Sequence, residues 1–188
     1  AWLNERRARA LERANALTVP TTRDEEWRFT DITPLTRIHF QPAAAAPGLA
    51  MADIASFIAP EATTHLVFVD GVFAPGLSAN VGLPYGVVIT NLAAALSTHA
   101  AVIEPHLACH AGFEQEVFAA LNTSYLRDGA FIWVAKNQKC PTPVQLLFVS
   151  TQKEAAAYPR VLVVAEPGSE CTLIEDHVGL ADAVYFSD

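Results

Sequence analysis

Two histidines and one cysteine near the middle of the chain have the types and spacing that metal chemistry requires. His106 and His110 stand at positions i and i+4, with Cys109 at i+3. On a helix these side chains would lie along one face, and imidazole and thiolate groups bind zinc and softer metals. No fourth ligand follows at metal-site spacing, and the competing interpretation is three half-exposed side chains before an amphipathic helix. We therefore expect no bound metal, and these three residues are the candidates for one.

Two further cysteines and one acidic segment are the other groups whose side chains could take part in chemistry. Cys140 precedes a proline, and Cys171 lies in an apolar run; either could ligate a cluster, although buried cysteine commonly behaves as a small hydrophobe. Glu175, Asp176 and His177 could place an acid and a base at a strand end, or form a solvated strand terminus. The serine elbow of hydrolases and phosphate-binding glycine loops are missing. The sequence thus predicts no catalytic and no cofactor-binding residue.

The amino-acid composition narrows the classes of binding partner and the cellular compartment that we expect. The chain has 188 residues, 52% of them hydrophobic and 17% charged, which is enough to bury a core. A formal charge of -8 and a pI near 5.2 argue against binding to nucleic acid or to an anionic membrane surface. No apolar run approaches the ~20 residues that span a bilayer. Three cysteines without framework spacing favour a reducing compartment, so we expect a cytoplasmic protein, or one from a plastid interior.

Hydrophobic spacing predicts the elements of the first two thirds of the chain. Amphipathic helices are predicted over residues 2–17 and 113–125. Residues 41–48, which prolines bracket, are predicted to form a linker. Asp53 and Asn91 are each placed to cap a helix.

The remaining signals indicate strands. Asp70 and Gly71 suit the positive φ angles of a type I′ turn, so residues 65–73 are predicted to form a hairpin. Beyond residue 129 the apolar runs shorten; they are residues 131–134, 144–149, 161–165 and 171–174. Such runs are typical of strands in stacked sheets. Their onsets are uneven, about 10 to 17 residues apart, so no clean solenoid repeat is visible.

The segment around Trp27 combines local structure signals. Thr22 and Glu25 have the spacing of a capping box, which predicts a short helix starting there. Trp27 supplies a large apolar area, so we expect it to be largely buried and to fix that helix to the β part. Thr30 and Asp31 precede a proline and offer side-chain oxygens for a following turn.

This segment also resembles the N-terminal signature of the SufB/SufD family of iron–sulfur cluster assembly proteins. The matching positions are Trp27, Arg28, Thr30 and Asp31, together with the acidic pair before them. Five further blocks continue the resemblance in the expected order, at residues 83–96, 118–122, 128–132, 143–147 and 159–176. The signature, and the absence of an N-terminal cysteine cluster, favour SufD-type members over SufB-type members. The resemblance covers only the N-terminal part of such proteins.

The resemblance implies an α+β fold leading into a mainly β one. Its N-terminal helical and mixed α/β region would span residues 1–128, and residues 129–188 would be the first strands of a right-handed parallel β-helix, cut short. Trp27, Arg28, Thr30 and Asp31 would have structural roles. Because an uncovered β-helix end leaves backbone groups unpaired, self-association of this segment is expected.

The implied function is that of a non-catalytic scaffold subunit for iron–sulfur cluster assembly. Its partners would be a SufB-like paralogue and a SufC-like ATPase, bound through a C-terminal part that this chain lacks. The cluster would belong to the complete complex, with no cofactor held by this segment. Two alternatives remain from the residues themselves. One is a small metal-dependent hydrolase or cupin-like protein using His106, Cys109 and His110, and the other is a free-standing β-rich interaction module.

Overall fold

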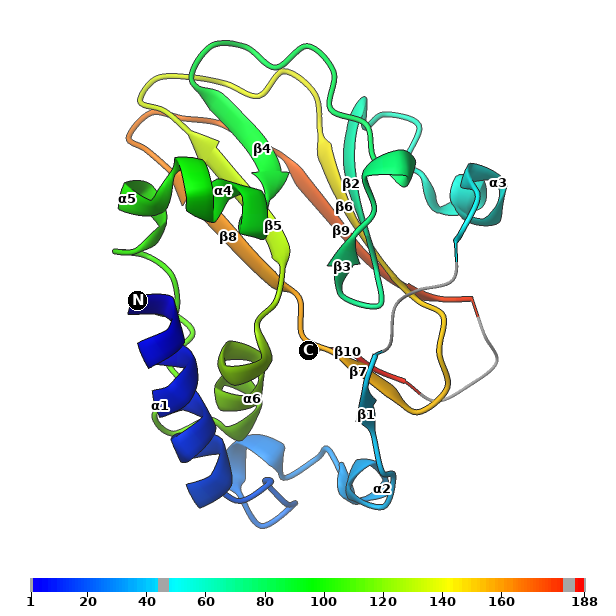
Figure 1. The fold of residues 1–188 in the computed structure, drawn as a ribbon, viewed down its shortest axis with the longest axis vertical. Coiled ribbons are helices and arrows are strands. Elements are labelled where there is room, and N and C mark those ends of the chain that lie inside the picture. The colour runs from blue at the N-terminus through cyan, green and yellow to red at the C-terminus, as the bar shows by residue number, and fades with distance from the viewer. Residues whose placement is uncertain (1, 44–47, 181–184, 188) are drawn as a thin grey trace.

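The computed structural model describes residues 2–43, 48–180 and 185–187, and its strands form three sheets (Figure 1). Sheet B has the order β3 (Val72–Phe73), β2 (Thr64–Val69), β6 (Val144–Ser150), β9 (Leu173–Gly179). Sheet C has the order β4 (Val87–Asn91), β5 (Gly129–Val134), β8 (Arg160–Ala165). Sheet A has the order β1 (Gln41–Pro42), β7 (Ala155–Ala157), β10 (Phe186–Ser187).

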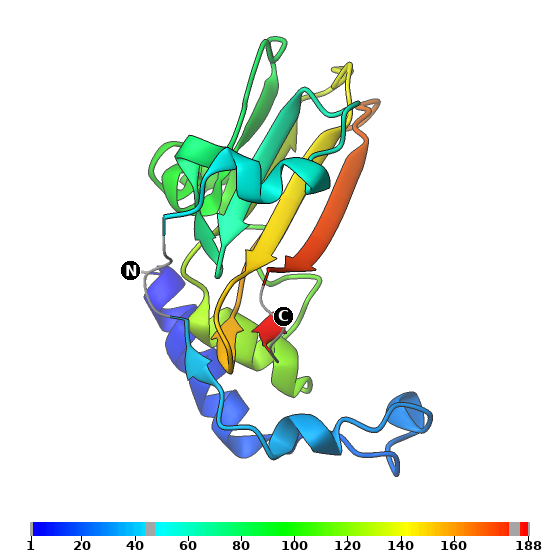
Figure 2. The same cartoon turned by 90° about the vertical axis from the view of Figure 1, so that its right-hand side faces the viewer.

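The strands from β5 onward pass through these sheets in a repeating order. β5, β6 and β7 lie in sheets C, B and A, and β8, β9 and β10 follow in the same sequence of sheets. Each later strand pairs in parallel with its predecessor; Gly129 faces Arg160, Val144 faces Leu173 and Ala156 faces Phe186. These partners are 31, 29 and 30 residues apart. We call β5 to β7 the first turn and β8 to β10 the second turn; Figure 2 shows β6 and β9 side by side.

The main core lies between sheets B and C. Alternate residues of the facing strands point into it, as the period of a strand requires. Leu146 and Phe148 come from β6, and Ile132 and Val134 from β5. All four side chains are buried. The strands of the first turn therefore bury a closely packed apolar core together with β2 and β4.

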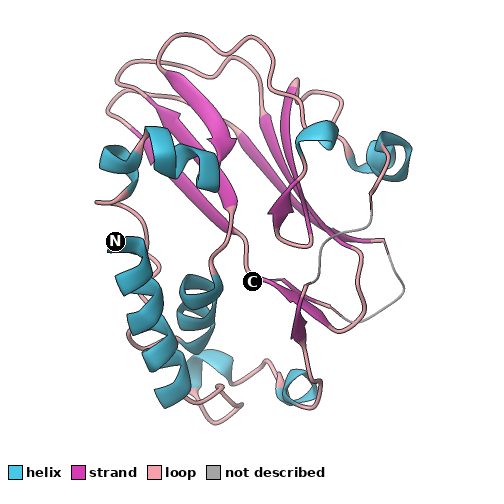
Figure 3. Cartoon of the chain, in the orientation of Figure 1, coloured by secondary structure: helices cyan, strands magenta, loops and turns pink. Residues whose placement is uncertain are grey.

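Helices cover the outer faces of both sheets (Figure 3). α4 (Leu92–Thr98) and α5 (Ala100–Ile103) pack on sheet C, where Phe131 and Leu162 point outward. A helical turn, α3 (Met51–Ile54) and η2 (Ala55–Phe57), packs Ile54 against Leu147 of sheet B. The order of layers is thus helix, sheet C, sheet B, helix. None of the helices described is long and apolar enough to span a membrane.

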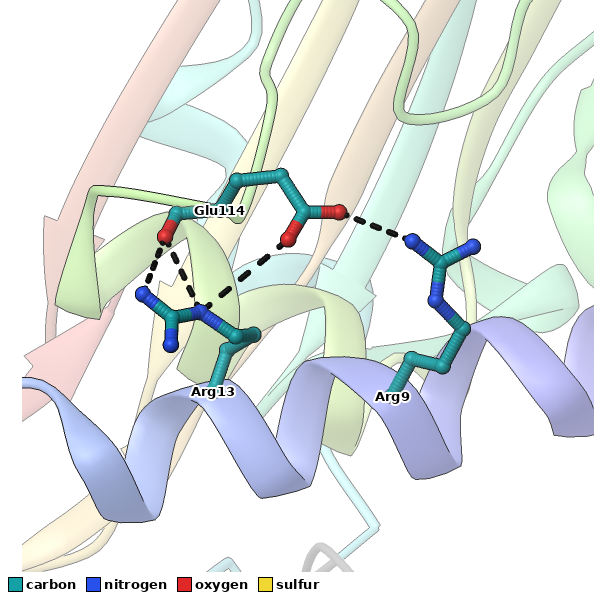
Figure 4. A network of polar contacts seen from close by, with 3 residues as sticks. All are labelled: Arg9, Arg13 and Glu114. Carbon is teal, nitrogen blue, oxygen red and sulfur yellow. Dashed lines mark hydrogen bonds and ion pairs between the residues drawn. The ribbon is translucent and has the colours of Figure 1, made fainter.

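The two longest helices, α1 (Trp2–Ala16) and α6 (Val117–Tyr125), pack on each other at Ala10 and Ala120. Arginines of α1 reinforce this contact. Arg9 and Arg13 both reach Glu114, the first through the carboxylate at 3.0 Å and the second also through the backbone carbonyl (Figure 4). These contacts are exposed, so each is worth at most about 1 kcal/mol. Short helical turns follow α1 and the hairpin; they are η1 (Glu25–Trp27), α2 (Thr33–Thr36) and η3 (Pro75–Leu77).

Several predicted elements are confirmed. The helix predicted over residues 2–17 is α1, and the predicted hairpin is β2 and β3. Its turn residues Asp70 and Gly71 have φ angles of 49° and 81°, as a type I′ turn needs. The helix predicted over residues 113–125 begins only at Val117. The predicted linker, residues 41–48, begins with β1, and residues 44–47 lie outside the described part of the chain.

The boundary predicted between residues 128 and 129 stays a prediction. Strands from both sides of it share all three sheets, because β1 pairs in parallel with β7, β2 pairs in parallel with β6, and β4 pairs antiparallel with β5. The predicted right-handed β-helix likewise stays a prediction.

Both predicted helix caps are wrong in detail. Asn91 precedes α4 but makes no cap with its side chain. Asp128 does so from a distant position in the sequence, because its Oδ1 accepts from the Ala93 amide at 3.0 Å. Asp128 also accepts from the Asn91 side-chain amide and from the Gly129 backbone. Asp53 lies inside α3, and its carboxylate accepts from the amide of Ala50.

Asp128 therefore ties α4 to the start of β5, and it is 8% exposed. Asp128→Ala would leave several donors without a partner, so we expect a loss of about 2 to 4 kcal/mol in the free energy of unfolding. Urea denaturation measures this loss. The control is Asp53→Ala, which removes one exposed bond and should cost ~1 kcal/mol or less. Equal losses in the two variants would contradict the role given to Asp128.

Candidate functional site

The candidate metal residues do not lie on a helix. His106, Cys109 and His110 occupy the turns after α5, and all three are exposed. Ala108 has a φ angle of 57°, which breaks any helical path between the two histidines. The Cys109 thiol donates to the Pro105 carbonyl at 2.8 Å. Within the described ranges no three His, Cys, Asp or Glu side chains gather as a metal site would need.

The Trp27 segment is also built differently from its prediction. The helix there is a single 3-10 turn, η1, and Thr22 and Glu25 form no capping box. The carboxylate of Asp24 instead accepts from the amide of Thr21 at 2.7 Å and from its hydroxyl at 3.2 Å. The reaching-back carboxylate thus belongs to Asp24 and bonds Thr21, one residue earlier than the predicted pair of Glu25 and Thr22.

The other residues of this signature make local contacts. Arg28 lies 3.9 Å from the Glu25 carboxylate, and its guanidinium lies over the exposed ring of Phe29. The amide of Thr30 donates to the Trp27 carbonyl at 2.9 Å. Asp31 Oδ1 accepts from the Thr33 amide at 2.9 Å, at the start of α2. Hydrogen bonds from Thr33, chiefly from its side chain, lower the pKa of the Asp31 carboxyl below its ordinary value of 3.8.

Trp27 is half-buried rather than buried, and it packs on a helix. Its ring lies 5.7 Å from that of Phe118 in α6. Phe118 in turn lies 6.0 Å from Phe186 of β10, which contacts Phe40 and Tyr158. Among the ring contacts of the described residues, Trp27 therefore reaches the strands through Phe118 and Phe186, and the ring that it contacts itself belongs to a helix. Ring pairs at these distances are favourable beyond their buried area.

Glu175 and His177 form a polar pair in a strand that continues the apolar core. They lie within β9, not at a strand end, and register places them beside Leu146 and Phe148 of β6. Residues in register on parallel strands point to the same side, so both lie on the face of β9 that is turned toward sheet C, where they remain exposed. His177 Nε2 lies 3.0 Å from Glu175 Oε1, and its ring stacks on Phe148 at 4.7 Å. Asp176 points to the opposite face and accepts from Gln145 at 2.7 Å.

A pocket of about 440 Å³ opens beside this pair at the edge of the second turn. Arg160 also lines it, and its guanidinium is held by Asn122 Oδ1 at 2.8 Å and Thr123 Oγ1 at 3.1 Å. The pocket is thus lined by a guanidinium and a carboxylate–imidazole pair. Arg160 and Asn122 were not predicted as site residues, because they reach this pocket from β8 and α6, which lie far from Glu175 in the sequence.

The comparisons with known proteins agree on one family. The model for the SufBD protein N-terminal region matches residues 1–146. An iron–sulfur cluster assembly SufBD family protein of Synechocystis is 35% identical over 184 residues, which cover 93% of this chain and 39% of that protein. The iron–sulfur cluster assembly protein SufD of Bacillus subtilis is 28% identical over 194 residues, covering 98% and 44%. This chain therefore spans about two fifths of the length of these relatives.

The half-buried position of Trp27 predicts a moderate effect of its removal. Trp27→Ala should lower the free energy of unfolding by about 2 kcal/mol, because a partly exposed ring loses less than a core ring. The matched control is Phe29→Ala, since Phe29 is 94% exposed and should change stability by less than ~0.5 kcal/mol. Thermal unfolding of both variants tests this. A loss at Phe29 as large as at Trp27 would contradict the ring chain.

The hydrogen bond from the Thr33 amide to the Asp31 carboxylate should make the start of α2 sensitive to acid. Folding lowers the pKa of Asp31, so the bond is fully present above pH 3.8 and is lost as the pH falls through the lower, folded value. The Thr33 amide resonance should therefore shift with a midpoint below 3.8 in an NMR titration. Asp31→Asn keeps an oxygen acceptor and should abolish the transition. A midpoint above 3.8 would show that the bond does not form in solution.

Proposed function

This chain belongs to the SufBD protein family, and on that premise we propose that it is the N-terminal part of a non-catalytic scaffold subunit for iron–sulfur cluster assembly. The family relationship connects the chain with cluster assembly. The observation that supports a scaffold role is the repeated strand order, in which each strand of the second turn pairs with one of the first. Such an arrangement presents backbone edges and a packed interior, which suit a framework.

We propose that the two turns are the start of a right-handed parallel β-helix. The parallel registers, spaced by about thirty residues, support the stacking direction. Among the described strands, β8, β9 and β10 each pair on one side only, so all three edges of the second turn are free. Free edges attract further strands, and a following turn would satisfy their N–H and C=O groups.

The proposed partners are a SufB-like paralogue and a SufC-like ATPase, which would bind segments of the protein beyond this chain. The iron–sulfur cluster would be the cargo of that complex, and no residue of this chain is assigned as its ligand. The acidic balance of the chain supports protein partners over nucleic acid. The proposed location is the cytoplasm or a plastid interior.

A pull-down that compares two lengths of protein tests this proposal. The complete gene product that carries this chain should capture both partner proteins from a purified mixture, whereas residues 1–188 alone should capture neither. Capture of the ATPase by the short segment would contradict the assignment of its docking site. Failure of the complete protein to bind either partner would overturn the scaffold proposal itself.

The short segment should also self-associate in light scattering, because its second turn has free edges. Val163→Lys places a charge on the edge strand β8, and it should shift the segment toward monomer. The matched control is Val72→Lys in β3, the edge strand of sheet B opposite β9; Val163 and Val72 are 40% and 48% exposed. A monomeric wild-type segment, or an equal effect of both variants, would contradict association through the second turn.

A further inference from the structure

Cys140 and Cys171 lie at the same place in successive turns of the sheets. Lys139 forms a parallel bridge with Glu170, just before β6 and β9 respectively. The amide of Glu170 donates to the Gln138 carbonyl at 3.0 Å, and the amide of Cys140 donates to the Glu170 carbonyl at 2.8 Å. The residue after each member of the bridge is a cysteine. The backbone therefore places Cys140 opposite Cys171.

Both thiols point toward the interior. Lys139 Nζ and Glu170 Oε1 form an ion pair at 2.5 Å on the outside, where their side chains are 63% and 65% exposed. Because successive residues of an extended strand point to opposite sides, the cysteines face inward. Both are only partly exposed and pack against the core between sheets B and C. The two sulfur atoms thus lie on the same face of two adjacent backbone segments.

The spacing of the two backbones suits a disulfide. Neighbouring strands lie about 4.7 to 4.9 Å apart, within the range of about 4.4 to 6.8 Å that Cα atoms of a disulfide adopt. Burial, with a further contribution from the Cys140 thiol, raises the pKa of the Cys171 thiol to about 11. Little of Cys171 is thiolate at neutral pH, so its reaction with an oxidant is slow there and faster in alkali.

We propose that Cys140 and Cys171 form a redox modification site, which a low-molecular-weight disulfide converts to an intrachain disulfide between the two turns. One cysteine thiolate attacks the small disulfide, which gives a mixed disulfide and releases one small thiol. The second thiolate attacks the cysteine sulfur of that mixed disulfide and releases the other small thiol. In total the pair loses two protons and two electrons, and the small disulfide is reduced to two thiols.

The third cysteine provides an internal comparison. Cys109 is exposed and lies in the turns after α5, where its thiol donates to the Pro105 carbonyl. Sequence places no cysteine beside it, so it should react singly with any thiol reagent. Cys109→Ser should therefore leave the disulfide between Cys140 and Cys171 unchanged.

Redox equilibration followed by peptide mapping tests the proposal. The protein, with all of the chain it carries, is equilibrated in oxidised and reduced glutathione mixtures at mildly alkaline pH, and free thiols are then alkylated. Trypsin cleaves after Lys139, Lys153 and Arg160, so the two cysteines fall in different peptides. We expect a linked peptide pair that grows to most of the protein as the mixture becomes oxidising, and that disappears on reduction. Cys109→Ser should give the same pair.

The wild-type map decides the outcome without any variant needing to fold. Two alkylated peptides at every ratio of glutathione would overturn the proposal, and so would stable glutathione adducts on either cysteine without a link. A link from Cys109 to either residue would also overturn it. Cys171→Ser should lose the linked pair and leave Cys140 as a glutathione adduct. Because partner binding is not measured, failure here leaves the scaffold proposal unaffected.

Discussion

The parallel backbone pairing between the two turns is the interaction on which the rest of this structure depends. It aligns β8 with β5, β9 with β6 and β10 with β7, so each inner position of the second turn lies over one of the first. The same pairing determines which residues become neighbours across about thirty positions of sequence. It brings Cys140 to Cys171, and Leu146 to Glu175. The helices act on the outer faces, where they bury the apolar sides that the pairing leaves uncovered.

Local signals in the sequence predicted the elements whose stability is local. The helix α1 has a helical apolar stripe, and the Asp70-Gly71 turn has a conformation that few other dipeptides adopt, so both were found. The apolar runs predicted β5, β6 and β8 to within a few residues. β7 was missed because Ala155–Ala157 has little strand propensity and pairs only through its sheet neighbours.

In three places the conformation depends on contacts between residues far apart in the sequence, which local patterns do not predict. The onsets of successive apolar runs show no clean repeat, because the strand order repeats only after three strands and the strand registers alone reveal it. The cap of α4 comes from Asp128, which no spacing near Asn91 indicates. The spacing of His106, Cys109 and His110 suits a helix, but no helix forms there, since Ala108 adopts a positive φ angle. In each case the local sequence pattern favours one conformation, and contacts with distant residues determine another.

The inner face of sheet B changes from apolar in the first turn to polar in the second, and this limits which strand can pair with β9. Leu146 and Phe148 give way in register to Glu175 and His177, which satisfy each other at 3.0 Å while the edge of β9 is open to water. A strand that pairs with this edge removes water from a carboxylate and an imidazole. That desolvation is unfavourable unless the covering strand supplies polar partners or the pocket keeps its water. Phe148 already shields one face of the imidazole, so partners can approach His177 only from the open side. An apolar strand in register with β9 would therefore destabilise the stack at this point, and a polar one would complete it.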